Sequence, residues 1–136
     1  MSTFVLKIKD LSISLPQNAD RKFAVENINL DVSKGEILCI VGESGSGKSV
    51  LTSAILNEVP GMLQITSGSI EFDGVDILQL PQKELNEIRG ARISMIYQEP
   101  MAALNPSIRV GKQVDEVFAL HRPDIKPDLR KNETLK

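Results

Sequence analysis

This sequence has few of the residues that mark specialised classes of protein. Among its 136 residues Cys39 is the only cysteine, so an internal disulfide is excluded. No run of about eighteen apolar residues occurs, as a membrane-spanning helix would require. Residues 1–7 lack the basic head, the apolar stretch and the small-residue cleavage site of a signal peptide. We therefore expect the chain to stay in the cytoplasm.

An excess of charge of one sign is also missing. The chain carries 16 lysine and arginine residues against 18 aspartate and glutamate residues, and no segment is basic enough to suggest a nucleic-acid partner. Hydrophobic residues make up 41% and charged residues 25%, which are proportions typical of a globular chain. The length suits one domain or a piece of one.

The first third of the sequence has the patterns of strands. Apolar and polar residues alternate loosely through residues 4–15, which predicts one or two half-buried strands before a loop at 16–20. Residues 27–32 alternate again and precede a turn at Lys34-Gly35, so a second one-sided strand is expected there. Residues 37–41 are apolar without interruption, which predicts a strand covered on both faces, as in a parallel sheet flanked by helices. Within that strand, Cys39 would be buried and inert.

A glycine-rich loop follows directly, and apolar residues then recur at helical spacing from Val50 to Ile55 until Pro60-Gly61. The order is therefore strand, glycine loop, helix. Further along, the patterns predict a hairpin over 69–78, a short helix over 81–89, a strand over 93–97, a loop over 100–106, an amphipathic helix over 110–120 and a weakly held segment over 121–136.

The glycine-rich loop has the phosphate-binding pattern G-x-x-x-x-G-K-S and consists of Gly42, Glu43, Ser44, Gly45, Ser46, Gly47, Lys48 and Ser49. Its glycines permit positive φ angles, so that successive backbone N–H groups face one anion at the start of the next helix. Lys48 would reach the β- and γ-phosphates, and the Ser49 hydroxyl would ligate Mg²⁺. A flexible Gly/Ser linker is the alternative, but the flanking strand and helix favour a site for ATP and Mg²⁺.

Three segments resemble one protein family. They read VGESGSGKS at residues 41–49, SGSIEFDG at 67–74 and RGARISMIYQEPM at 89–101, the last followed by Leu104-Asn105-Pro106 and Val110-Gly111. Together they resemble the ATP-binding subunit of ATP-binding cassette (ABC) transporters, in the oligopeptide and dipeptide importer branch. The third segment resembles the Q-loop of that family with the surroundings found in peptide importers.

The resemblance implies an α/β fold: a P-loop NTPase core of the ABC nucleotide-binding type, with an N-terminal antiparallel β part. It also implies that the chain ends before the signature motif and the Walker B strand. Residues 1–136 would then be the N-terminal portion of one such domain, divided into a β-rich part at 1–35, the strand, P-loop and helix at 36–60, the hairpin, helix and Q-loop strand at 61–100, and the start of a helical subdomain at 101–136.

The same resemblance implies a function. The complete subunit would hydrolyse ATP to drive the import of peptides or related solutes, whereas this portion would bind nucleotide without turnover. Its partners would be transmembrane permease subunits, a second ATP-binding subunit arranged head to tail and, indirectly, a solute-binding protein. It would lie in the cytoplasm, on the inner face of the cell membrane.

Individual residues follow from the resemblance as well. Lys48 and Gln98 would be the catalytic residues present, with Gln98 reaching Mg²⁺ and the attacking water; outside this motif, Gln98 would be an ordinary loop residue. The family has an aromatic residue that stacks on adenine, for which Phe23 is the nearest candidate and a strand-edge phenylalanine the alternative. The helix at 110–120 would face the transmembrane partner or pack on its own core, and the two are compatible. His121 lies in the wrong context for the switch histidine of the family and is expected in a solvated loop.

Two other classes of function remain. A small-molecule kinase would need acceptor-binding and lid arginines, and a GTPase an Asn-Lys-x-Asp motif, and the chain has neither. A binding or regulatory remnant that holds nucleotide without turnover is the other possibility. Cassette proteins that act on DNA or ribosomes carry different insertions near the Q-loop, and the Asn105-Pro106 context argues against them.

Overall fold

The computed structural model describes residues 4–134 and divides into two compact units, Met1–Pro81 and Gln82–Lys136, which are described in turn. The first unit contains the strands β1 (Phe4–Ser14), β2 (Phe23–Ser33), β3 (Gln64–Phe72) and β4 (Val75–Asp76), the helix α1 (Lys48–Ile55) and the short 3₁₀ helix η1 (Ile77–Gln79). The second contains α2 (Gln82–Ile88), α3 (Pro100–Ala103), α4 (Val110–His121) and α5 (Pro127–Thr134).

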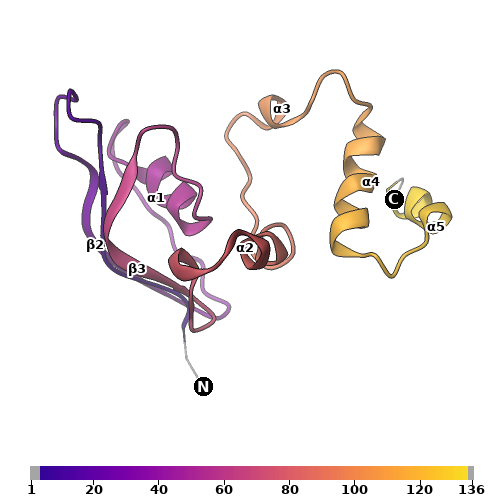
Figure 1. Cartoon of the computed structure of the whole chain (residues 1–136), viewed down its shortest axis with the longest axis horizontal. Coiled ribbons are helices and arrows are strands. Elements are labelled where there is room, and N and C mark those ends of the chain that lie inside the picture. Colours follow the sequence, from indigo (N-terminus) through magenta and orange to yellow (C-terminus); the bar gives the residue numbers. More distant parts are fainter. Residues whose placement is uncertain (1–3, 135–136) are drawn as a thin grey trace. The chain divides into compact units, whose positions relative to one another are not determined.

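The four strands form one antiparallel sheet in the order β2-β1-β3-β4, with α1 beside it (Figure 1). The predicted strands at 4–15 and 27–32 are confirmed, and β2 begins earlier than the pattern indicated. The predicted hairpin is also confirmed, since β3 and β4 pair across the Asp73-Gly74 turn.

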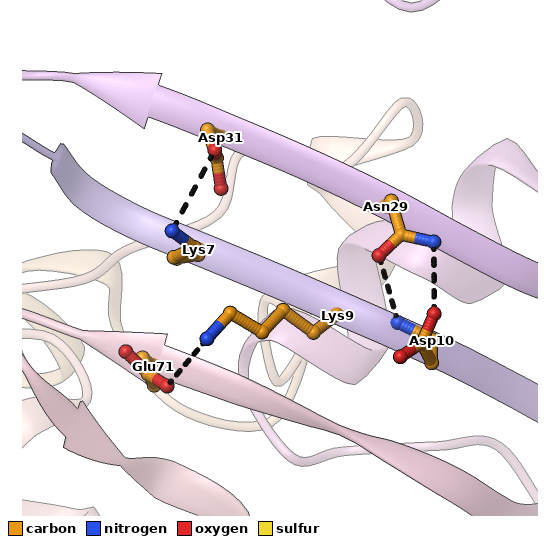
Figure 2. A network of polar contacts seen from close by, with 6 residues as sticks. All are labelled: Lys7, Lys9, Asp10, Asn29, Asp31 and Glu71. Atoms are coloured by element: carbon orange, nitrogen blue, oxygen red, sulfur yellow. Dashed lines mark hydrogen bonds and ion pairs between the residues drawn. The ribbon is translucent and has the colours of Figure 1, made fainter.

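One face of the sheet forms the core of this unit. Ile8, Leu11, Ile13 and Ile70 are fully buried, and Ile8 pairs directly with Ile70. α1 adds the buried side chains Leu51 and Ala54. The opposite face is polar, with ion pairs between Lys7 and Asp31 at 3.9 Å and between Lys9 and Glu71 at 3.8 Å (Figure 2).

A bulge in β1 explains the loose alternation of its sequence. The apolar positions move from even numbers (Leu6, Ile8) to odd numbers (Leu11, Ile13), and the register with both neighbouring strands shifts in this stretch. Asp10 takes the extra position with a φ of 48°, and its N–H and carboxylate bond reciprocally to the Asn29 amide at 3.1 Å (Figure 2). Of the one or two strands predicted at 4–15, the structure therefore has one, in which the apolar positions shift phase at the bulge.

Gly68 of β3 faces this bulge and is required there. Its φ is +94°, and a Cβ at this position would lie 2.5 Å from the Lys9 carbonyl oxygen and from the Leu11 Cα. A side chain would therefore push β3 away from β1 where the two backbones come closest.

The predicted strand at 37–41 does not form. These residues have no regular structure, and Ile37 and Val41 are 97% and 86% exposed. A parallel strand needs a neighbouring strand on which to pair. The strands of the described chain all belong to the antiparallel sheet, which does not include residues 37–41. Cys39 is exposed as a result, so the prediction of a buried thiol was wrong.

The second unit is helical. The short helix predicted at 81–89 is confirmed as α2, which buries Leu85 and ends before Gly90, and the amphipathic helix predicted at 110–120 is confirmed as α4. The predicted strand at 93–97 is absent, because its pairing is limited to one bridge between Arg89 and Ile93. The predicted loop at 100–106 begins instead with the short helix α3.

Side-chain contacts hold the later part of this unit. Gln113 of α4 donates to the carbonyl oxygens of Asn105 and Ile108 at 3.0 and 2.8 Å and accepts from the Asn105 N–H at 2.9 Å. α5 packs on α4, where Arg130 and Asp115 form an ion pair at 3.4 Å. The segment predicted as weakly held at 121–136 therefore contains a helix.

The connection between α4 and α5 carries an exposed ion pair. The Arg122 guanidinium donates to the Asp124 carboxylate at 2.9 Å, and this hydrogen bond lowers the pKa of that carboxyl below its usual value. Of the helices described between residues 4 and 134, none combines the length and the apolar character needed to cross a bilayer.

Candidate functional site

The glycine-rich loop runs directly into α1, as predicted. Gly47 is the N-cap of α1, with φ 92° and ψ 4°, and the first helical hydrogen bond runs from the Leu51 N–H to the Gly47 carbonyl oxygen at 2.9 Å. No side chain caps this end of α1 in the described structure. The first N–H groups of a helix have no partner within it, and together with the positive end of the helix dipole they favour a bound anion.

Gly47 also brings the loop against the sheet. A Cβ at this position would lie 2.5 Å from the Ala24 carbonyl oxygen and 2.6 Å from the Val25 Cγ1. Both of these residues are buried in β2. The start of β2 therefore supports the point where the loop turns into the helix.

Lys48 ties the loop together. Its ammonium donates to the carbonyl oxygens of Gly42 and Glu43, each at 2.6 Å, and to the Ser46 hydroxyl at 3.1 Å. The Ser46 N–H also donates to the Glu43 carbonyl oxygen at 3.2 Å. The ammonium thus lies against the backbone of the loop that the sequence pattern assigns to phosphate.

Ser49 lies in the first turn of α1 with an exposed side chain. Its hydroxyl is an oxygen ligand of the kind that Mg²⁺ takes together with phosphate oxygens. Elsewhere in the described residues, His, Cys, Asp and Glu side chains do not gather in groups of three or more that could hold a metal ion.

Phe23 is the first residue of β2 and is partly exposed, with the Lys22 ammonium 4.9 Å from the centre of its ring. The residues on both sides of it contact the loop. Ala24 lies against Gly47, and the Arg21 guanidinium donates to the Gly45 carbonyl oxygen at 2.6 Å. The structure thus brings the start of β2 to the phosphate loop, and Phe23 stays a candidate for the adenine contact.

Gln98 belongs to the second unit, where it is exposed in a segment without regular structure. Since the two units are described separately, Gln98 is not placed with respect to Lys48 and Ser49. His121 is the last residue of α4, and a Cβ on Gly90 would lie 2.6 Å from its Nε2. His121 therefore lies in a helix, close to Gly90 just after α2, and the prediction of a histidine in a solvated loop was wrong.

One feature of the site could not be read from the sequence. Arg21 belongs to no motif, and its contact with Gly45 spans 24 positions of the chain. In the second unit, taken by itself, the stripe of apolar side chains on α4 is exposed rather than packed on a core, with Val110, Val117 and Leu120 each more than half exposed.

Comparisons with known proteins show the family of the chain. Residues 25–135 match the family described as ABC transporter. The chain is 44% identical over 122 residues to the oligopeptide transport ATP-binding protein OppD of Bacillus subtilis, covering 88% of this chain and 34% of that protein. It is 43% identical over 124 residues to the probable D,D-dipeptide transport ATP-binding protein DdpD of Escherichia coli, covering 90% of this chain and 38% of that protein.

A solved structure shares the fold. The ATP-binding cassette MJ0796, solved as a dimer in a post-hydrolysis state with ADP and Pi, superposes with a TM-score of 0.78 at 24% identity, covering 96% of this chain and 54% of that one. The fold is thus that of the N-terminal part of an ATP-binding cassette. With a glycine-rich loop that leads into α1 and a family match over most of its length, the chain belongs to the ABC transporter family.

Proposed function

We propose that the chain binds MgATP through residues 42–49 and is the nucleotide-binding part of an ABC importer subunit for peptides or related solutes. The observation that carries this proposal is the geometry of the loop in a chain of this family. The Lys48 ammonium lies against the loop backbone, and α1 begins where the loop ends. The names of the matched relatives, which are transport proteins for oligopeptides and dipeptides, support the class of solute. The chain spans about a third of the length of those relatives.

Each residue has a part in holding the nucleotide. The backbone N–H groups at the start of α1 would face the phosphates, the Lys48 ammonium would exchange carbonyl oxygens for phosphate oxygens, and the Ser49 hydroxyl would hold Mg²⁺. When bound, Mg²⁺ neutralises the charge that develops on the phosphates. Phe23 would lie at the adenine.

The experiment compares the wild-type chain with Lys48→Ala in a titration of a fluorescent ATP analogue. Losing the ammonium removes both the charge at the phosphates and the bonds that close the loop, so affinity should fall at least about tenfold, or about 1.4 kcal/mol. Lys34→Ala, which removes an exposed cation at a turn, serves as the matched control and should bind like wild type. Equal affinities of Lys48→Ala and wild type, with binding detected, would refute the assignment.

Turnover and coupling are proposed for the longer protein. By its resemblance to the family, Gln98 would reach the metal and the attacking water there, so Gln98→Ala should lower ATPase and transport rates more than nucleotide affinity. The measurement needs the full-length subunit with its permease partners. Wild-type rates in that variant would leave Gln98 without such a role.

The 136-residue chain by itself should bind nucleotide without turnover. A phosphate loop and Mg²⁺ leave most of the barrier in place, because the family mechanism also needs a carboxylate for the water and a signature loop at the γ-phosphate. Phosphate release with MgATP should stay well below about 1 s⁻¹, the lower end of typical enzyme rates. A rate near that value would contradict the proposal.

In the whole protein, the partners would be transmembrane permease subunits, a second ATP-binding subunit arranged head to tail and, indirectly, a solute-binding protein. The dimer formed by MJ0796 supports the paired arrangement. The complex would lie on the inner face of the cell membrane with this subunit in the cytoplasm. The family match argues against a different P-loop enzyme, and the names of the relatives favour a transport subunit over a non-catalytic remnant.

A further inference from the structure

Arg21 reaches the phosphate loop from a well-defined position. It lies in the loop between β1 and β2, which is closed by hydrogen bonds from the Leu15 N–H to the Lys22 carbonyl oxygen at 2.9 Å and from the Ala19 N–H to the Pro16 carbonyl oxygen at 3.0 Å. From there its Nη2 donates to the Gly45 carbonyl oxygen at 2.6 Å. A guanidinium on a fixed backbone can hold its partner in one orientation.

Gly45 is the glycine of the phosphate loop that neither the sheet nor Lys48 contacts. Gly47 is wedged against β2, and Lys48 bonds to Gly42, Glu43 and Ser46. Gly45 has a φ of +80°, and a Cβ built on it would meet nothing within 4 Å. The bond from Arg21 therefore acts on the one glycine of the turn that neither the sheet nor Lys48 holds.

The orientation of the Gly45 carbonyl matters because of peptide geometry. In a trans peptide the C=O and the next N–H point in opposite directions. If Arg21 holds the Gly45 carbonyl outward, the Ser46 N–H must point into the loop, where it donates to the Glu43 carbonyl oxygen at 3.2 Å. In an anion nest this N–H would donate to the bound phosphate in place of the Glu43 carbonyl oxygen.

We propose that Arg21 is a positioning residue for phosphate binding, which acts by holding the Gly45–Ser46 peptide with its N–H turned into the loop. The proposal rests on the proposed function, because it assumes that residues 42–49 bind phosphate. It predicts an effect on every ligand with a polyphosphate, whether or not a nucleoside is attached.

The test titrates MgATP, MgADP and inorganic tripolyphosphate into the wild-type chain and into Arg21→Ala, Arg21→Lys and the control Lys34→Ala. Arg21→Ala should raise the Kd about threefold to tenfold for all three ligands, the size expected for losing one charge-assisted hydrogen bond at an exposed site. Arg21→Lys keeps a donor of similar reach and should restore the Kd to within about twofold of wild type. Thermal unfolding midpoints should be the same in all variants, since Arg21 is exposed.

Measuring the Kd values at high salt distinguishes this positioning role from simple electrostatic attraction between Arg21 and the phosphates. Attraction between exposed charges is screened at about 0.5 M salt, whereas a misplaced N–H stays misplaced, so the ratio of the Arg21→Ala and wild-type Kd values should persist there. A ratio that falls to one in high salt would overturn the positioning role. So would a loss confined to the two nucleotides, which would mean that Arg21 reads the nucleoside.

A second measurement needs no ligand. Hydrogen exchange of the Ser46 amide should be about threefold to tenfold faster in Arg21→Ala than in wild type, because the bond to Glu43 would open more often. Unchanged exchange would overturn the proposal whatever the titrations show. If the wild-type chain bound none of the three ligands, the proposed function would fail, and the exchange rates would still decide whether Arg21 holds the peptide.

Discussion

Gly47 is subject to two constraints at once. Its backbone has a φ of 92°, a conformation that is unfavourable for residues with a Cβ. A Cβ at this position would also overlap the Ala24 carbonyl oxygen. Gly45, two positions earlier, has a similar φ of +80° but open space around it. The pair therefore separates the cost of the backbone angle from the cost of the close approach.

We expect Gly45→Ala to lower the free energy of unfolding by about 1 kcal/mol through the angle alone. Gly47→Ala should lower it by about 2 to 4 kcal/mol, because the overlap with β2 must be relieved by moving the loop or the strand. Denaturant unfolding followed by circular dichroism measures both. Equal losses would mean that the contact between Gly47 and β2 is not tight.

At the scale of elements, the sheet has an apolar face and a polar face that differ in their contribution to stability. Ile70 of β3 is fully buried opposite Ile8, whereas the ion pair between Lys9 and Glu71 on the other face is solvated, with the Lys9 side chain 51% exposed. Burial of apolar surface stabilises strongly, and an exposed ion pair does so weakly.

Ile70→Ala should therefore cost about 2 to 5 kcal/mol of unfolding free energy, from lost burial and from the cavity left behind. The matched substitution on the polar face, Lys9→Ala, should cost less than about 1 kcal/mol. Urea unfolding midpoints of the two variants and of wild type decide the point. A larger loss for Lys9→Ala would show that the core lies elsewhere.

At the scale of the whole molecule, the segment at 37–41 stands out because its apolar side chains are exposed and it pairs with no strand of the described chain. Exposed apolar residues that are not paired in a sheet offer a segment with which another chain can associate. We expect the isolated chain to self-associate through this segment.

Ile37→Lys should reduce that association, because a charge at a position that is 97% exposed costs the monomer nothing and disfavours pairing. Met62→Lys, at a position 78% exposed outside the segment, is the control and should associate like wild type. Light scattering over a range of protein concentrations gives the sizes. A monodisperse wild-type monomer would contradict the prediction.

Much of the local structure could be predicted from the sequence because local rules govern it. The turn at Asp73-Gly74, α1 after the glycine loop, and α4 depend on residues within a few positions of one another, so their patterns were sufficient. The shift of apolar positions in β1 was also visible as loose alternation, although the bulge at Asp10 that causes it was not recognised.

By itself the sequence determined that a glycine-rich loop with the phosphate-binding pattern leads into a helix that begins at Lys48, because pattern and helix start both depend on neighbouring residues. Only the tertiary structure decided that Arg21 meets Gly45, that β2 lies under Gly47, and that Cys39 is exposed. The physical reason is that a strand such as 37–41 is stable only when partners supply its hydrogen bonds and cover its faces. Apolar composition shows that such partners are needed, and the tertiary structure decides whether they are there.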